Sequence, residues 1–215
     1  MSLFITFEGI EGSGKSTQIA LLAERLRARE RTVLTTREPG GCTIADAVRT
    51  ILLDARNTAM VPRAELLLYA AARAQHIEEV IRPALDSGTT VLCDRFADAT
   101  LAYQGFGRGL DMKVIEELNG LATGGLAPDL TLLLDFPPEE GVQRALRRND
   151  SRSGPNEDRF ELESIAFHRR IREGYLELAR REDRFRVVDA RGSIDEVAGR
   201  IARAVDPVLA AGVRQ

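Results

Sequence analysis

Cysteine and histidine are scarce in this chain of 215 residues, and long apolar runs are missing from it. Two cysteines, Cys42 and Cys93, are too few for a disulfide scaffold or a cysteine-rich zinc site. The isolated histidines His76 and His168 argue against a histidine metal cluster, and we expect each to be a surface or capped histidine. No apolar run approaches the roughly 18 residues of a membrane span, and a strand-like segment from Leu3 leaves no room for a secretory leader. We therefore expect a reduced, cytoplasmic protein with no membrane partner.

Lysine is rare beside arginine. Only two of the 30 basic residues are lysines, Lys15 and Lys113. The 30 basic and 33 acidic side chains give a formal net charge of −3, which argues against non-specific coating of nucleic acid. An anion site in this chain must therefore be a local concentration of donors, and a lysine is a position to inspect.

Short β-rich segments alternate with longer segments of helical period. The predicted strands are residues 3–8, 32–36, 89–94, 130–135 and 185–190, several of them continuous apolar runs typical of a parallel sheet. Apolar residues recur at helical spacing at Ile19, Leu22, Ala23 and Leu26, at Ile44, Ala47, Val48 and Ile51, and at Ile194, Val197, Ile201, Val205 and Val208. Ser193 and Glu196 have the spacing of a capping box before the last set. This order predicts an α/β fold, a three-layer, doubly wound sandwich around a five-stranded parallel sheet, in one domain over residues 1–215.

Residues 9–16, Gly-Ile-Glu-Gly-Ser-Gly-Lys-Ser, fit the P-loop pattern G-x-x-x-x-G-K-[ST] between a predicted strand and a predicted helix. Glycines let backbone N–H groups turn inward around a polyphosphate, and the positive end of the next helix points at the same anion. Lys15 can reach the β- and γ-phosphates, and the Ser16 hydroxyl can bind Mg²⁺. An ordinary glycine turn is the alternative. We expect ATP to bind at Gly9, Ile10, Glu11, Gly12, Ser13, Gly14, Lys15, Ser16 and Thr17.

Two arginines follow predicted strands beside this P-loop. Arg37 lies in Thr-Arg-Glu-Pro-Gly-Gly after the second strand, and Arg95 opens a polar segment after the third. Ligands of open α/β sheets bind at the carboxyl ends of the strands, so both arginines can grip a substrate phosphate. A lone arginine here would usually be a surface residue, but two beside a P-loop favour binding. Asp94, which ends the third strand, is a second candidate for holding Mg²⁺.

Several classes of protein share a P-loop. A GTPase would carry N-K-x-D for guanine, which this sequence lacks, and a large oligomeric ATPase would be longer. A small kinase remains. Two rivals stay open: a different nucleoside or nucleotide kinase of the same superfamily, and a nucleotide-dependent switch ATPase with no small acceptor. The switch would explain the P-loop but not the second set of arginines, Arg37, Arg73 and Arg95.

Six motifs spread over most of the chain are similar to those of bacterial thymidylate kinases. They are F-E-G-x-E-G-x-G-K-S-T (7–17), T-R-E-P-G-G (36–41), A-A-R-A-Q (71–75), D-R-F…A-Y-Q-G (94–105), P-D-L-T-L-x-L-D (128–135) and D-R-F-E (158–161). T-R-E-P-G-G together with D-R-F…A-Y-Q is specific to that family. The resemblance implies a homodimeric, Mg²⁺-dependent enzyme that transfers the γ-phosphoryl group of ATP to dTMP, giving dTDP and ADP.

The resemblance also implies roles for single residues. Arg37 and Arg95 would bind the phosphate of the acceptor, and Glu11 would contact its 3′-hydroxyl. Tyr69 would stack on thymine where the family usually has phenylalanine, and Arg73 would hydrogen-bond the base. Tyr103 would lie near the 2′ position and help exclude ribose, while Thr100 and Gln104 would make polar contacts to the base. Ala99 stands where the family often has serine.

A polar stretch, residues 149–158, predicts an exposed, mobile loop. The family divides into members with a catalytic arginine in the P-loop and members that supply it from a lid. Gly12 follows Glu11 here, so the chain resembles the second type, with a lid over about 147–159. An arginine delivered on closure stabilises the transferring phosphoryl group without promoting idle hydrolysis. The arginines in or beside this lid are Arg144, Arg147, Arg148, Arg152 and Arg159, which on a helix could also be a solvated face. We expect Arg148 and Arg152 to be catalytic together with Lys15 and Arg95.

Overall fold

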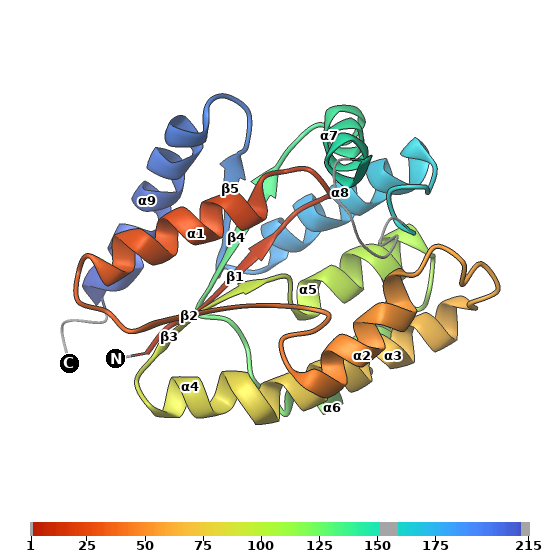
Figure 1. Ribbon diagram of the computed structural model, residues 1–215, viewed down its shortest axis with the longest axis horizontal. Coiled ribbons are helices and arrows are strands. Elements are labelled where there is room, and N and C mark those ends of the chain that lie inside the picture. Colours follow the sequence, from red (N-terminus) through yellow and green to blue (C-terminus); the bar gives the residue numbers. More distant parts are fainter. Residues whose placement is uncertain (1, 151–158, 212–215) are drawn as a thin grey trace.

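The computed structural model describes residues 2–150 and 159–211, without the side chains of 148–150 and 211. Five parallel strands form one sheet in the order β2-β3-β1-β4-β5. The strands are β1 (Phe4–Glu8), β2 (Val33–Arg37), β3 (Thr90–Asp94), β4 (Leu130–Asp135) and β5 (Phe185–Asp189). All five were predicted from the sequence to within one residue at each end, and the α/β, doubly wound architecture is confirmed (Figure 1).

Helices connect these parallel strands. They are α1 (Lys15–Arg27), α2 (Thr43–Leu53), α3 (Pro62–His76), α4 (Arg82–Asp86), α5 (Ala97–Thr100), α6 (Met112–Thr123), α7 (Pro138–Asp150), α8 (Ile165–Arg181) and α9 (Ile194–Ala211). Two π-helical turns, η1 (Ile77–Ile81) and η2 (Leu101–Gly107), join α3 to α4 and extend α5. None of the helices in the described ranges is long and apolar enough to cross a membrane.

Helices α1 and α9 cover one face of the sheet (Figure 1). The predicted stripe of α1 is buried against β1 and β3, and Val197, Ile201 and Val205 of α9 join the same core. Ile194 departs from the stripe, with 58% exposure at the start of α9. The capping box is confirmed, because the Ser193 N–H donates to Glu196 Oε2 at 2.8 Å and the Glu196 N–H donates to Ser193 Oγ at 3.2 Å.

The opposite face carries the helices that shape the site. Helix α8 buries one apolar stripe against β4, β5 and η2. The stripe consists of Phe167, Ile171, Tyr175 and Leu178. Nearer β3, Ile77 and Ile81 of η1 pack on Val91 and Phe96. The π-helical turns therefore lie in the connections that follow α3 and β3.

The apolar stripe of α2 has an unexpected direction. The helix predicted from the spacing is present, but Ile44 and Ile51 are 56% and 48% exposed. The helix packs on α3 instead of on the sheet, through small Ala45 and Ala72. A contact between helix backbones needs small residues, so the larger apolar side chains point away from it.

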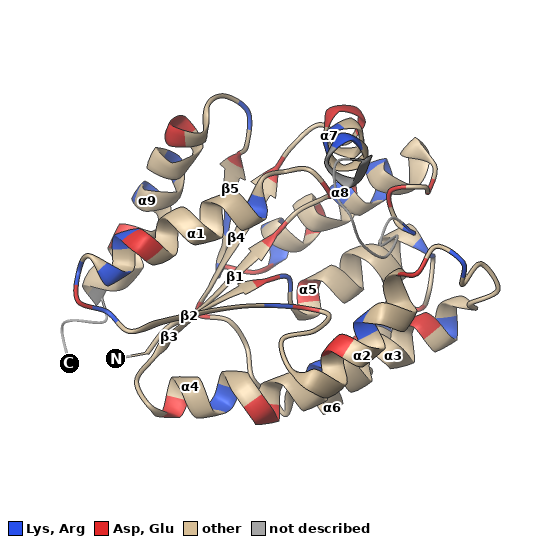
Figure 2. Ribbon diagram, viewed as in Figure 1, with Lys and Arg blue, Asp and Glu red and all other residues tan. Residues whose placement is uncertain are grey.

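Three parallel strands bring their carboxyl ends together. In register, Arg37 of β2 pairs with Asp94 of β3, and Asp94 pairs with Phe7 of β1. Elsewhere, Lys and Arg are interspersed with Asp and Glu along the elements (Figure 2). The sheet itself therefore places the P-loop beside both arginine-bearing segments.

Candidate functional site

The P-loop connects Glu8, at the end of β1, to Lys15, at the start of α1. Gly9, Gly12 and Gly14 have φ values of 132°, 70° and 92°, a backbone region that glycine reaches without a steric cost. Gly12 has a second reason to be glycine, because an added Cβ would overlap the carbonyl oxygen of Gly141 in α7. The loop is thus shaped for a phosphate on one side and packed on the backbone of α7 on the other.

Lys15 lies inside this loop. Its Nζ donates to the carbonyl oxygens of Gly9 at 2.9 Å and Ile10 at 3.0 Å. Burial, followed by the charge of Arg95, lowers the pKa of Lys15 from 10.5 to about 8. Neutral carbonyl oxygens hold an ammonium less tightly than a phosphate anion does, so the ammonium is placed to exchange them for a phosphate.

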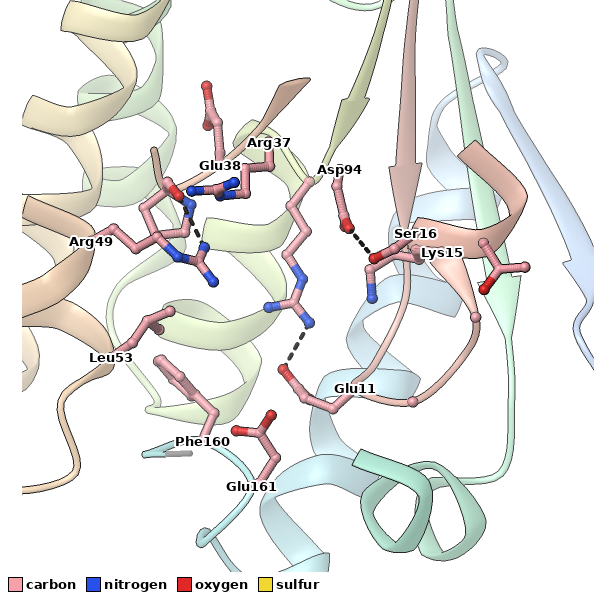
Figure 3. Close-up of a pocket in the computed structure, with 15 residues that line it drawn as sticks. Glu11, Lys15, Ser16, Arg37, Glu38, Arg49, Leu53, Asp94, Phe160 and Glu161 are labelled. Atoms are coloured by element: carbon pink, nitrogen blue, oxygen red, sulfur yellow. Dashed lines mark hydrogen bonds and ion pairs between the residues drawn. The ribbon is translucent and has the colours of Figure 1, made fainter. Parts of the chain in front are cut away.

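The loop opens on a cavity of about 640 Å³ (Figure 3). Figure 3 shows Arg37 and Arg49 on one wall, with Lys15 and Ser16 across from them. Of the expected ATP residues, Glu11, Gly12, Gly14, Lys15, Ser16 and Thr17 line the cavity. The side chains of Ile10 and Ser13 serve the loop instead, because Ile10 packs in the core and Ser13 Oγ donates to the Ile10 carbonyl oxygen at 2.9 Å.

Ser16 and Asp94, the two expected Mg²⁺ residues, lie next to each other. Ser16 Oγ donates to Asp94 Oδ2 at 3.2 Å. One hydroxyl and one carboxylate at the mouth of a phosphate loop suit Mg²⁺, which takes its other ligands from water and phosphate oxygens. No group of three or more His, Cys, Asp or Glu side chains with metal-binding geometry occurs in the described part of the chain. The donors present therefore fit a cation that arrives with a nucleotide.

Three arginines face this cavity. Arg37 is oriented by Asp46, because Arg37 Nη2 donates to Asp46 Oδ1 at 3.0 Å. Arg49 of α2, which the sequence analysis missed, donates to the Pro39 carbonyl oxygen at 3.0 Å and lines the same wall. Arg95 has a φ of 69°, uncommon for a residue with a side chain. Strained backbone of this kind persists where surrounding contacts fix it.

Arg95, Glu11 and Tyr103 form one hydrogen-bonded group. Glu11 Oε1 accepts from Arg95 Nη2 at 2.7 Å and from the Tyr103 hydroxyl at 2.6 Å. Arg95 also donates to the Tyr103 oxygen at 2.8 Å, and its guanidinium lies 4.8 Å from the centre of the Tyr103 ring. Burial alone would raise the pKa of the Glu11 carboxyl, but the charge of Arg95 and the contact with His168 hold it well below its usual range. Glu11 is therefore a carboxylate held next to the cavity.

A second, narrow hollow adjoins the first. The four residues expected around the base line it, namely Tyr69, Arg73, Thr100 and Gln104. Arg95, expected at the acceptor phosphate, and Tyr103, expected at the sugar, line it as well. Gln104 Nε2 donates to Glu65 Oε1 at 2.8 Å, and burial raises the pKa of the Tyr69 phenol. Ala99 also lines this hollow, with a methyl group where a serine would have a hydroxyl.

Arg73 is fixed more firmly than the sequence could indicate. Its Nε donates to Glu38 at 2.8 Å, its Nη1 to Asn119 at 2.8 Å, and its Nη2 to Thr100 Oγ1 at 2.9 Å and the Phe96 carbonyl oxygen at 3.0 Å. A guanidinium has five N–H donors, so these four bonds leave one for a ligand. Glu38 and Asn119 were not predicted. Glu38 had a signal, since it lies in the T-R-E-P motif, whereas Asn119 had none.

Comparison with known proteins gives one consistent result. A family model for thymidylate kinase matches residues 7–201. The chain belongs to the thymidylate kinase family. The thymidylate kinase of Trichlorobacter lovleyi is 63% identical over 98% of this chain and all of its own, and that of Syntrophotalea carbinolica is 61% identical over 94% of each. A crystal structure of the Ehrlichia chaffeensis thymidylate kinase superposes with a TM-score of 0.76 at 33% identity, covering 95% of this chain and 98% of that one.

Membership of the thymidylate kinase family confirms that the chain is an enzyme, a nucleoside monophosphate kinase. The expected reaction, transfer of the γ-phosphoryl group of ATP to dTMP, is the reaction of this family. The rival kinases and the switch ATPase are not favoured.

The structure describes only some of the arginines in or beside the expected lid. Arg148 belongs to α7, but its side chain is not described, and Arg152 lies outside the described residues. Arg159, beside the expected lid, is turned into the protein, where its Nε donates to the Leu52 carbonyl oxygen at 2.5 Å and its Nη2 lies 2.6 Å from Glu65. Arg144 lies over the ring of Phe136, with 4.2 Å between its Cζ and the ring centre.

The expectation for the histidines of this thymidylate kinase was wrong. Both are fully buried, and each contacts a buried glutamate. His76 Nδ1 is 3.2 Å from Glu38 Oε1, and His168 Nδ1 is 3.4 Å from Glu11 Oε2. These partners lie far away in the sequence, so spacing along the chain held no sign of them.

Proposed function

We propose that this chain binds ATP at the P-loop and dTMP in the adjoining hollow, and that it transfers the γ-phosphoryl group in line between them. The observation that carries the proposal is that Arg95 and Glu38 line both hollows. The two sites therefore share a wall, and an acceptor with its base near Arg73 presents its phosphate to the cavity that holds Lys15. Phosphoryl transfer needs this kind of positioning more than it needs covalent chemistry.

In this proposal the residues around the cavity hold two polyanions together. The P-loop backbone and Lys15 bind the β- and γ-phosphates of ATP, while Arg37 and Arg95 hold the phosphate of dTMP. Lys15 and Arg95 also stabilise the charge that spreads over the transferring group. Bound Mg²⁺ supplies further neutralisation of the phosphate oxygens, and Ser16 and Asp94 are the residues that hold it.

The narrow hollow selects the acceptor. Tyr69 stacks on thymine, Arg73 offers its one remaining N–H to the base, and Thr100 and Gln104 complete the polar wall. Glu11 binds the 3′-hydroxyl, and Tyr103 crowds the 2′ position. A missing methyl group on the base costs only about 1–3 kcal/mol, so dUMP is a poor but detectable acceptor.

The proposal extends beyond the described residues. Arg148 and Arg152 of the expected lid supply positive charge to the γ-phosphate when substrates are bound. The enzyme works in the cytoplasm, where ATP is supplied, and it works as a homodimer. The uncovered apolar stripe of α2, with Ile44 and Ile51 exposed, supports the last point.

The test is ADP formation from ATP and Mg²⁺ with dTMP, dUMP, dCMP, UMP and AMP offered separately. We expect a clear preference for dTMP and little hydrolysis of ATP without an acceptor. Equal turnover with every acceptor would contradict the roles of Tyr69 and Arg73. Hydrolysis that ignores all acceptors would return the protein to the class of switch ATPases.

A further inference from the structure

Asn119 of α6 is a buried amide whose two ends make different hydrogen bonds. Its Oδ1 accepts from Arg73 Nη1 at 2.8 Å, and its Nδ2 donates to the Ala97 carbonyl oxygen at 3.1 Å. A guanidinium can only donate and a carbonyl oxygen can only accept, so the amide has one possible orientation. Asn119 is absent from the described residues that line the cavity and the narrow hollow. Any effect of this side chain on a substrate therefore passes through its two partners.

These partners belong to the two halves of the acceptor site. Arg73 lines the narrow hollow that the proposed function gives to the base. Ala97 begins α5 two residues after Arg95, which the proposed function gives to the acceptor phosphate. Arg73 also reaches this turn itself, because its Nη2 donates to the Phe96 carbonyl oxygen at 3.0 Å. Arg73 and Asn119 thus bind consecutive carbonyl oxygens of the segment that follows Arg95.

The backbone at Arg95 depends on contacts of this kind. Its φ of 69° is uncommon for a residue with a side chain and persists only where the surroundings fix it. From the sheet, Cys93 Sγ donates to the Arg95 carbonyl oxygen at 3.0 Å, and Glu8 Oε1 accepts from the Phe96 N–H at 2.8 Å. Asn119 holds the same segment from the other side, by tying the start of α5 to α6.

We infer that Asn119 is a positioning residue that joins Arg73 to the turn carrying Arg95, so that the grip on the acceptor phosphate depends on a side chain outside both hollows. The inference rests on the proposed roles of Arg73 and Arg95. Without the amide donor, the start of α5 is released from α6, and the backbone at Arg95 relaxes toward a more common φ. The guanidinium of Arg95 then moves away from the phosphate, whereas Arg73 keeps its bond to Glu38 and its place in the hollow.

The experiment compares the dissociation constants of dTMP and of thymidine, measured by titration calorimetry. Thymidine has the base and the sugar but no phosphate, so the ratio of its Kd to that of dTMP measures what the phosphate adds. Partial unfolding of a variant lowers the fitted number of sites and leaves this ratio unchanged.

Asn119→Asp separates the two bonds of the amide. It keeps the oxygen that faces Arg73 and replaces the donor to Ala97 by a second oxygen, which is ionised at neutral pH beside the guanidinium. We expect the Kd of dTMP to rise about tenfold, the effect of one hydrogen bond to a charged group, and the Kd of thymidine to stay within about twofold of wild type. Asn119→Leu loses both bonds and should raise both constants, that of dTMP by the larger factor.

Gln18→Glu is the matched control. It makes the same change from amide to acid at another buried side chain, whose Nε2 donates to the Ile194 carbonyl oxygen at 3.0 Å, and it should leave the ratio unchanged. An unchanged ratio in Asn119→Asp would overturn the inference, whether both constants rise together or neither moves. If Asn119→Asp does not fold, the ratio in Asn119→Leu decides in the same way.

Arg95→Met tests the proposed function separately, because it removes the phosphate contact itself. It should lower the ratio at least as far as Asn119→Asp does. If Arg95→Met lowers the ratio and no Asn119 variant does, only this inference fails. If Arg95→Met leaves the ratio unchanged, the role of Arg95 in the proposed function fails as well.

Discussion

Glu8 shows how one buried side chain supports the site. It ends β1, where its Oε1 accepts from the Phe96 N–H at 2.8 Å and its Oε2 accepts from the Tyr175 hydroxyl at 2.7 Å. The first bond fixes the residue after Arg95, whose φ is positive. Burial, and next the charge of Asp98, raise the pKa of Glu8 to about 8. The turn that presents Arg95 is thus held by a carboxyl group that retains its proton well above its usual range.

This carboxyl makes stability depend on pH. Its pKa is raised in the folded state from an unfolded value of about 4.3. Its favourable contribution is therefore complete below that value and is lost as pH rises through about 8. We expect Glu8→Gln, which cannot ionise, to gain free energy of unfolding relative to wild type between pH 5 and pH 8.5. Each unit of pKa difference is worth about 1.4 kcal/mol, and urea unfolding at both pH values measures the gap. Parallel stability curves for the two proteins would contradict the assignment.

At the scale of elements, the decisive contact joins the P-loop to α7. Gly12 and Gly141 meet backbone to backbone, since a Cβ on Gly141 would lie 2.5 Å from the Glu11 carbonyl oxygen. The P-loop therefore has no room for a side chain at position 12. An arginine side chain at position 12 would therefore push α7 away.

We expect Gly12→Ala to destabilise the fold and reduce activity. The left-handed φ of 70° costs a residue with a side chain about 1–2 kcal/mol, and the overlap with Gly141 adds about 1–3 kcal/mol. Gly199→Ala in α9 is the control, because its methyl group has room and alanine stabilises a helix interior by roughly 0.5–1 kcal/mol. Thermal unfolding and ADP formation report both effects. A Gly12→Ala protein as stable as wild type would show that α7 does not rest on the loop.

The same elements show what the sequence could and could not predict. Strands buried on both faces are continuous apolar runs, so their positions followed from the sequence, as did the P-loop. The resemblance to the family, and not the residue pattern alone, singled out the residues that line the narrow hollow. The stripe of α2 misled, because periodicity indicates an apolar face but not whether that face meets the core. His168 and Asn119 were out of reach, since their partners are brought near only by the packing of α8 and α6. Arg49 was missed because a single arginine on a helix resembles a solvated one.

At the scale of the molecule, α3 exposes an apolar residue as α2 does, since Leu67 is 53% exposed. The two helices pack on each other through Ala45 and Ala72. Val187, on the edge strand β5, is an apolar residue of similar exposure, at 52%. A second copy of the chain, packed against α2 and α3, would bury the apolar area that these helices expose to water.

We expect the enzyme at micromolar concentration to have twice the 23.7 kDa mass of one chain. Ile51→Glu should bring the mass down toward that of a monomer, because it would bury a charge at the interface. Val187→Glu should leave the mass unchanged. Light scattering after size exclusion measures all three proteins, and a dimer that tolerates Ile51→Glu but not Val187→Glu would place the interface at β5 instead.

The scarcity of lysine also bears on chemical labelling. Acylating reagents attack an unprotonated amine, and near pH 8 about half of an amine with a pKa of about 8 is unprotonated, whereas less than about one in a hundred ordinary lysines is. Lys113 is the only other lysine side chain in the sequence. Modification of Lys15, followed by mass spectrometry, therefore becomes a readout of whether the phosphate loop is occupied, obtained without a label on the nucleotide.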